Sequence, residues 1–367
     1  LGHLSPAQFM QRHWQRKPLL VRHAIPDFKP LLSRNDLVAL AEDETIESRL
    51  ITAGTPKRWT FARGPFTRRQ IPPYKQRQWT LLLQGMDMQH DDVHALMRQF
   101  RFIPDARLDD VMISYATDGG GVGPHFDSYD VFLLQAHGQR RWRIGRQKDR
   151  TLVDGLPVRI LADFQPEEEY LCNPGDLLYL PPGWAHDGVA EGECMTYSMG
   201  FKVPQKGDLA RELLVRMADA AGDALGEGLY KDAGQAAVAH PAEIPASMGA
   251  FAQGVVEAAL RDGNNIACAL GEYLTEPKAN VWFDAPEKAP KTIQGGIVLD
   301  RRSHMLYDAK HIYLNGESYR AAGKDATLMR ALANQRQLTA AQTAKASDQA
   351  RALLLEWLDA GWVHAVP

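Results

Sequence analysis

Residues 109–145 read DDVMISYATDGGGVGPHFDSYDVFLLQAHGQRRWRIG, and residues 175–188 read GDLLYLPPGWAHDG. Both segments alternate short apolar runs with turns that are rich in glycine and proline. This pattern predicts short strands that form a small antiparallel barrel or sandwich. We expect strands at 111–115, 131–135, 140–144, 177–180 and 195–201, with a hairpin turn at 137–139.

Two histidines and one aspartate in these segments have the spacing of a metal site. His125 and Asp127 are two residues apart, so on a strand their side chains lie on the same face. His186 follows a strand and a turn whose prolines and glycine fix the backbone. Two histidines and one carboxylate on one face of a metal, with the other positions open, are the ligands of non-haem Fe(II) oxygenases. We therefore predict that His125, Asp127 and His186 bind a metal.

The strand at 140–144 is predicted to carry one arginine into the barrel. Alternation places Arg140 on the same face as Trp142 and Ile144, which is the more apolar and hence the inner face. A buried guanidinium is costly unless it meets an anion, and its fork suits a carboxylate. Arg140 is therefore a candidate to bind the carboxylate of a small molecule, and an ion pair with an internal acid is the alternative. Arg141 and Arg143 would face solvent or a polyanion.

Three further side chains are expected near the metal. Asp110 and Met112 are two residues apart and share a face, and Tyr129 follows Asp127 by two residues. An acid, a flexible thioether and an aromatic ring can surround a long cationic side chain. A core-filling role for Met112 is the alternative.

The composition excludes several classes of protein. The chain has 367 residues, of which 45% are hydrophobic and 24% charged, as in soluble proteins of two or three domains. A net charge of −3 argues against non-specific nucleic-acid binding by the whole chain. No stretch reaches the roughly 18 apolar residues of a membrane span. Three cysteines without a CxxC pair indicate a reducing compartment, so we expect a cytoplasmic protein.

The periodicity changes after about residue 205. Helical spacing extends from 208, where Asp208 is a candidate cap, to about 275. A segment with several prolines follows at 275–291 and is expected to be a linker. The remainder is predicted to be a small α+β unit, with strands at 297–299, 305–307 and 312–314 and helices at 327–335 and 348–358.

These segments resemble the JmjC-type cupin oxygenases, and in particular the bacterial ribosomal oxygenases that hydroxylate an arginine of a large-subunit ribosomal protein. The resemblance is carried by the two quoted segments, by MTYSMGF at 195–201 and by WQRKPLLVR at 14–22. It implies an α+β fold with a double-stranded β-helix barrel, or jelly roll. The implied domains are a JmjC cupin catalytic domain with N-terminal helices at 1–205, a helical dimerisation region at 206–276 and a winged-helix-like domain at 277–367.

The resemblance also implies roles for individual residues. It makes His125, Asp127 and His186 the ligands of a catalytic Fe(II), and Arg140 the partner of the distal carboxylate of 2-oxoglutarate. The implied pocket for the target arginine consists of Asp110, Met112, Tyr129 and Ser198. Ala116 departs from the family pattern, in which a serine there helps Arg140 to hold 2-oxoglutarate. Thr196 is the candidate to replace that hydroxyl.

The reaction implied by the resemblance is hydroxylation at Cβ of an arginine in the large-subunit ribosomal protein number sixteen. Fe(II) would be the cofactor, 2-oxoglutarate and O₂ the co-substrates, and the enzyme a homodimer.

Other functions stay open on the sequence alone. A JmjC hydroxylase of another residue, such as histidine, or a demethylase would use the same ligands, although Asp110 favours a cationic target. A non-catalytic metal-binding cupin that docks on the ribosome or on nucleic acid is the alternative from a different class. Sequence-specific DNA binding is not expected, because the helices at 327–335 and 348–358 lack an excess of basic residues.

Overall fold

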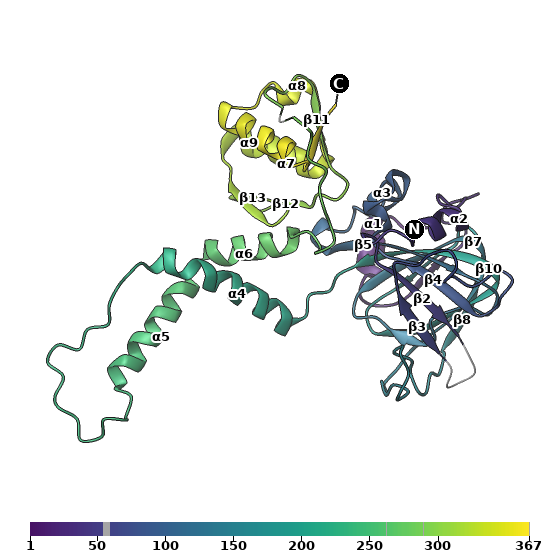
Figure 1. The fold of residues 1–367 in the computed structure, drawn as a ribbon, viewed down its shortest axis with the longest axis horizontal. Helices are drawn as coiled ribbons and strands as arrows, with labels where there is room; N and C mark the ends of the chain where they lie inside the picture. The colour runs from purple at the N-terminus through teal and green to yellow at the C-terminus, as the bar shows by residue number, and fades with distance from the viewer. Residues whose placement is uncertain (54–58, 262, 289, 367) are drawn as a thin grey trace. The chain divides into compact units, whose positions relative to one another are not determined.

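The computed structural model describes residues 1–53, 59–261, 263–288 and 290–366, and it divides into the compact units Leu1–Val203 and Pro204–Pro367 (Figure 1). Within the described residues, no helix is both long enough and apolar enough to cross a membrane. The elements of the first unit are α1 (Pro6–Arg12), β1 (Leu19–Val21), α2 (Arg34–Leu40), β2 (Ser48–Thr52), β3 (Thr60–Arg63), β4 (Trp79–Leu83), η1 (Met86–Met88), α3 (Asp91–Arg98), η2 (Asp105–Arg107), β5 (Leu108–Ala116), β6 (His125–Phe126), β7 (Asp130–Arg146), β8 (Glu168–Cys172), β9 (Leu177–Leu180) and β10 (Trp184–Phe201).

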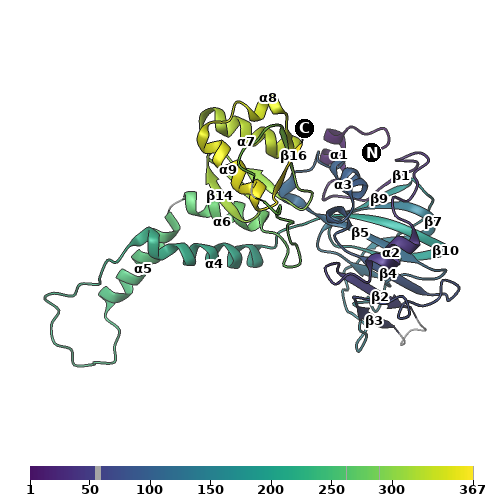
Figure 2. The same cartoon turned by 45° about the horizontal axis from the view of Figure 1, so that its top comes forward.

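The strands of the first unit form one antiparallel sheet that curves into the predicted barrel (Figure 2). Its order is β1-β9-β7-β10-β5-β4-β2-β3, with β6 on β10 and β8 on β7. The long strands β7 and β10 pair with each other along most of their length, from Trp184↔Arg146 to Phe201↔Asp130. These two strands therefore connect the part of the sheet that contains β9 and β5 with the part that contains β8 and β6.

The two faces of this sheet pack against different partners. On the outer face, Phe132 and Tyr179 lie against Phe9 of α1, with ring centroids 5.4 and 4.9 Å from that of Phe9. On the inner face, Leu133 and Leu178 belong to a separate buried cluster that also contains Trp142. Because strand residues alternate between faces, this inner cluster forms the floor of the barrel interior.

The predicted hairpin turn at 137–139 is wrong, because β7 runs through these residues as one strand. Gly138 has φ +59, and a Cβ on it would lie 1.9 Å from the carbonyl oxygen of Glu193. The register of β10 slips opposite this glycine, between Glu191 and Met195. The residues therefore form a bulge that bends the β7–β10 ribbon instead of reversing it.

The bulge also changes which residues of β7 face inward. Val131 and Leu133 line the barrel interior before it, and Arg140 and Trp142 line the interior after it. The expected inward direction of Arg140 is thus found, while Arg141 and Arg143 form ion pairs on the outside with Glu169, Glu191 and Asp187.

The second unit begins with helices and ends with a small α+β fold. Its elements are α4 (Lys206–Leu225), α5 (Ala246–Arg261), α6 (Gly263–Thr275), β11 (Gly296–Leu299), β12 (Met305–Tyr307), β13 (His311–Leu314), β14 (Glu317–Arg320), α7 (Gly323–Gln335), β15 (Gln337–Leu338), α8 (Ala340–Thr343), α9 (Asp348–Asp359) and β16 (Val363–Val366). The N-cap of α4 is Gln205, so the predicted cap Asp208 lies inside the first turn instead. Asn315 and Gly316 form the tight turn between β13 and β14, both with positive φ.

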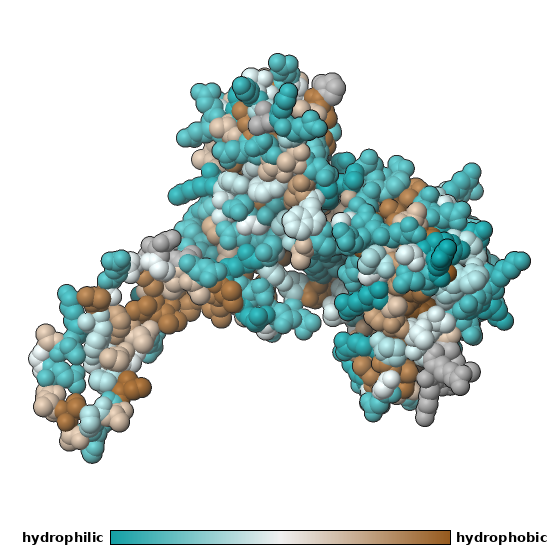
Figure 3. Space-filling view, in the orientation of Figure 1, coloured by the Kyte–Doolittle hydropathy of each residue, from teal (hydrophilic) through white to brown (hydrophobic). Residues whose placement is uncertain are grey.

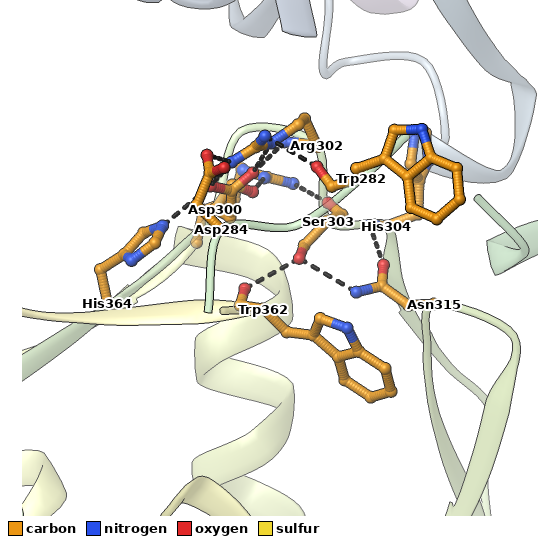
Figure 4. A network of polar contacts seen from close by, with 10 residues as sticks. Trp282, Asp284, Asp300, Arg302, Ser303, His304, Asn315, Trp362 and His364 are labelled. Carbon is orange, nitrogen blue, oxygen red and sulfur yellow. Dashed lines mark hydrogen bonds and ion pairs between the residues drawn. The ribbon is translucent and has the colours of Figure 1, made fainter. Parts of the chain in front are cut away.

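A polar network joins the irregular segment after α6 to the last strand (Figure 4). The Asp300 carboxylate accepts hydrogen bonds from Arg302 and from the His364 ring, with Nε2 of His364 at 2.8 Å. Arg302 also donates to the carbonyl of Trp282 and to Asp284. Burial raises the pKa of Asp300, but these hydrogen bonds outweigh it and lower the pKa to about 2.

Candidate active site

The two candidate histidine ligands are brought together by strand pairing. β6 pairs with β10 so that His125 lies directly opposite His186. Residues opposite each other in an antiparallel pair project to the same face, and the two ring centroids are 4.2 Å apart. The stiff turn before His186 is fixed to the other ligand segment, because the Gly183 amide donates to the carbonyl of Asp127.

The Asp127 carboxylate completes a group of three possible metal ligands. Its Oδ2 lies 3.6 Å from Nε2 of His186 and 4.0 Å from Nε2 of His125. One ligand atom from each residue lies within 4.8 Å of the other two, and no other group of three or more His, Cys, Asp or Glu in the described residues is comparably close. The structure therefore brings His125, Asp127 and His186 together as the spacing predicted.

The protein holds both imidazoles in the orientation that a metal requires. Nδ1 of His125 lies 2.8 Å from the Gly123 carbonyl, and Nδ1 of His186 lies 3.1 Å from the Trp184 carbonyl. Because a carbonyl only accepts, Nδ1 carries the proton in each ring and Nε2 keeps its lone pair. Burial and the neighbouring His125 lower the pKa of His186 to about 4, so its ring is neutral at pH 7, as a metal ligand must be.

Arg140 is a buried cation with unsatisfied donors. Its side chain lines the same cavity as the three ligands, and the residue is only 5% exposed. Nη1 donates to Ser114 Oγ at 3.4 Å, whereas Nε and Nη2 are buried without a hydrogen-bond partner. The only nearby ring is that of Trp142 among the described contacts, 5.6 Å from the guanidinium carbon. A buried guanidinium whose Nε and Nη2 lack partners would donate hydrogen bonds to a small carboxylate that enters the cavity.

The hydroxyl beside Arg140 comes from a residue that the sequence did not indicate. Ala116 is fully buried in a cluster with Ala190 and Cys194. The hydroxyl of Thr196 donates to Gln135, and Thr196 is not among the described residues that line the cavity. Ser114, two residues before Ala116 on the same face of β5, contacts Arg140 instead.

The expected substrate side chains line the cavity as well. Asp110, Met112, Tyr129 and Ser198 all face it, and Met112 lies opposite Ser198 in the β5–β10 pair. Burial and the nearby carboxylates of Asp127 and Asp110 raise the pKa of Tyr129, so its phenol keeps its proton. This end of the cavity is therefore acidic, whereas the end at Arg140 is basic.

Sequence reasoning did not indicate Gln84 and Asp109, which also line the cavity. Gln84 follows β4 directly, and its amide nitrogen contacts both oxygens of Asp110. Asp109 forms an ion pair with Lys202 at 3.5 Å. The sequence contains a weak signal for Gln84, a polar residue that ends an otherwise apolar strand.

Comparisons with known proteins agree with this arrangement. The sequence model of the JmjC domain matches residues 95–209, and that of the ROXA-like winged helix matches residues 258–364. The ribosomal protein uL16 3-hydroxylase of Escherichia coli is 33% identical over 327 residues, which cover 86% of this chain and 85% of that protein. A probable ribosomal oxygenase of Haemophilus influenzae is 34% identical over 56% of this chain and 52% of its own length.

Solved structures of E. coli YcfD share the whole fold. An X-ray structure of YcfD covers 99% of both chains with a TM-score of 0.85 and 29% identity. A structure described as YcfD, a ribosomal oxygenase, in complex with cobalt and 2-oxoglutarate covers 99% of this chain and 98% of that one, with a TM-score of 0.83 and 29% identity. Together with the sequence match, these similarities establish that the chain belongs to the family of JmjC-domain ribosomal oxygenases.

Proposed function

We propose that this chain is an Fe(II)- and 2-oxoglutarate-dependent protein hydroxylase that acts at Cβ of an arginine in the ribosomal protein uL16, number sixteen of the large subunit. One observation carries the proposal: a three-ligand metal site lies in one cavity between an unsatisfied buried cation and a buried carboxylate. The similarity to the E. coli uL16 3-hydroxylase supports the choice of substrate. A ribosomal protein substrate also places the reaction in the cytoplasm.

In this proposal the chain supplies binding and orientation. His125, Asp127 and His186 hold the iron, with both Nε2 atoms directed to it by the carbonyl contacts at Nδ1. Arg140 binds the distal carboxylate of 2-oxoglutarate, and Ser114 Oγ accepts a hydrogen bond from the guanidinium. Bound iron supplies the activation of O₂ that allows a C–H bond to be hydroxylated while 2-oxoglutarate is converted to succinate and CO₂.

The substrate end of the cavity favours arginine over histidine. Asp110 is 2% exposed and brings a carboxylate to this end of the cavity, where it would attract a cationic side chain. Met112 and Tyr129 provide apolar and aromatic surface along the stem of a long side chain. A neutral imidazole offers one N–H donor, whereas a guanidinium offers five donors and a charge.

Mass spectrometry of the substrate tests this proposal. The uL16 protein is incubated with the enzyme, Fe(II), 2-oxoglutarate and O₂, and fragmentation locates any added oxygen. One oxygen on an arginine is the expected result. If succinate forms but no oxygen is added to uL16, the chain would still be an oxygenase, and uL16 would be rejected as its substrate. No succinate at all would favour a non-catalytic binding module.

We further propose a homodimer that forms through the helical region 206–276, next to a catalytic domain at 1–205 and a winged-helix domain at 277–367. Apolar side chains are exposed on α4, α5 and α6, and Figure 3 shows brown surface where α4 and α5 lie. The exposed residues include Leu214 and Val215 on α4 and Val255 and Val256 on α5, and α5 has no buried residue. Exposed apolar faces of this kind are typical of subunit interfaces.

Sedimentation at micromolar concentration tests the dimer. The wild-type chain is expected to sediment as a dimer, and Val256→Asp is expected to weaken it, because a charge in an apolar interface is costly. A wild-type chain that sediments only as a monomer would reject the proposal. Lys324→Asp, which changes an exposed charge outside this helical region, is the control.

A further inference from the structure

Gln84 contacts the Asp110 carboxylate in an unusually symmetric way. Its Nε2 lies 3.1 Å from Oδ1 and 3.0 Å from Oδ2 of Asp110. Both residues line the cavity, and Asp110 is almost completely buried. A donor shared equally by two carboxylate oxygens holds both oxygens at the same distance and so restrains the direction in which the carboxylate points.

The chemistry of the contact also determines which way the amide faces. Carboxylate oxygens accept hydrogen bonds, so the Gln84 nitrogen must be the atom that faces Asp110. The amide oxygen Oε1 is then directed away from Asp110. It is not one of the buried atoms without a partner, and Gln84 is a lining residue of the cavity.

The backbone around Gln84 is held from two sides. Its own amide donates to the carbonyl of Glu47 at 2.9 Å. The next residue, Gly85, has φ +67 and begins the η1 turn, whose Asp87 accepts from the amide of Val111 at 2.7 Å. Val111 is the neighbour of Asp110 on β5. The turn is therefore tied to the strand that carries the carboxylate, and the Gln84–Asp110 geometry is preorganised.

We propose that Gln84 is a positioning and specificity-determining residue for a guanidinium substrate. It orients the Asp110 carboxylate, and its Oε1 provides a second acceptor for an N–H of the same guanidinium. This proposal rests on the proposed function, because it assumes that a substrate side chain enters at this end of the cavity. A planar group with several donors matches a carboxylate and an amide oxygen together, whereas a ureido group presents its own oxygen to these acceptors.

A pair of peptides tests the role of Gln84. One is a uL16 segment with the target arginine, and the other carries citrulline, the neutral ureido analogue, at that position. Gln84→Met removes donor and acceptor at similar side-chain volume, and Gln84→Ala is a second variant in case the first does not fold. Gln89→Met makes the same change at a half-buried glutamine outside the cavity lining.

We expect Gln84→Met to lower kcat/KM for the arginine peptide by about 10- to 100-fold, the value of a hydrogen bond to a charged group. The effect on the citrulline peptide should be smaller, so that the preference for arginine decreases. Gln89→Met should change neither value, because Gln89 does not line the cavity. Equal losses for both peptides, or no loss, would overturn the proposal.

Binding separates this proposal from the proposed function. The affinity of each labelled peptide is measured by fluorescence anisotropy under anaerobic conditions, so that no turnover is needed. A wild-type chain that prefers the arginine peptide in a Gln84-dependent manner but does not hydroxylate it would refute only the proposed reaction. Hydroxylation of the arginine with affinities insensitive to Gln84→Met would refute only the role of Gln84. Absence of both binding and hydroxylation would refute both.

Discussion

Replacement of Arg140 should change stability and co-substrate affinity in opposite directions. In the substrate-free chain, Nε and Nη2 of Arg140 are buried without partners, and only a 3.4 Å contact to Ser114 and the ring of Trp142 stabilise the guanidinium. Each unsatisfied buried donor costs about 1–3 kcal/mol, whereas the cation–π contact returns about 1 kcal/mol. We therefore expect Arg140→Met to raise the free energy of unfolding of the substrate-free protein by about 1–5 kcal/mol.

The same substitution should nearly abolish use of 2-oxoglutarate. Removing one partner of a buried ion pair costs about 3–5 kcal/mol, because the other charge is left unpaired. The KM for 2-oxoglutarate is then expected to rise roughly 10²- to 10⁴-fold. The unfolding energy is obtained from urea titrations after metal removal, and the KM from succinate formation at varied 2-oxoglutarate.

Arg107 provides the matched control. It is also largely buried, but it pairs at 2.9 Å with the fully buried Asp130. Arg107→Met leaves that carboxylate without its cation and should destabilise the protein while the KM for 2-oxoglutarate stays unchanged. If Arg140→Met destabilised the substrate-free protein as Arg107→Met does, Arg140 would be structural, and the assignment of the basic end of the cavity would be refuted.

Three further predictions follow from individual contacts. Gly188→Ala places a Cβ 2.5 Å from the Trp142 ring, and such overpacking should cost about 1–3 kcal/mol, seen as a lower Tm; an unchanged Tm would contradict it. The depressed pKa of Asp300 contributes about 2 kcal/mol of stability that is present above pH 4 and lost as the pH falls towards 2. Asp300→Asn should lack this pH dependence of the free energy of unfolding in urea titrations between pH 5 and 2. The same pH dependence in both proteins would contradict the role of Asp300. Chelation by EDTA should stop peptide hydroxylation and succinate formation together, with recovery on Fe(II) but not Zn(II), and activity that survives chelation would exclude a metal mechanism.

The sequence predicted the parts of the site that depend on local geometry. His125 and Asp127 share a face because they are two residues apart, and the stiff turn before His186 predicted where that ring would lie. The parts that depend on pairing between distant strands were not predictable in this way. Ser114 and Thr196 lie opposite each other in the β5–β10 pair, and Ser114 is left to meet Arg140 because the Thr196 hydroxyl donates to Gln135 of β7.

The bulge at Gly138 illustrates the same limit. The segment 137–139 has the composition of a hairpin turn, and residues 140–144 restart the apolar alternation with the opposite parity. Both a turn and a bulge produce this pattern. The choice depends on the contact of Gly138 with Glu193, 55 residues away, which leaves no room for a side chain.

The charges of the cavity explain how two different ligands reach their places around one metal. Asp110 and Ser114 lie on the same face of β5, four residues and therefore roughly 13 Å apart. Arg140 lies at the Ser114 end, and Gln84 supports the carboxylate at the Asp110 end. A dianionic co-substrate at the Asp110 end would meet a buried carboxylate, and a guanidinium at the other end would meet Arg140. Since both wrong placements bring like charges together inside the barrel, the cavity orients the two ligands before any group on the metal reacts.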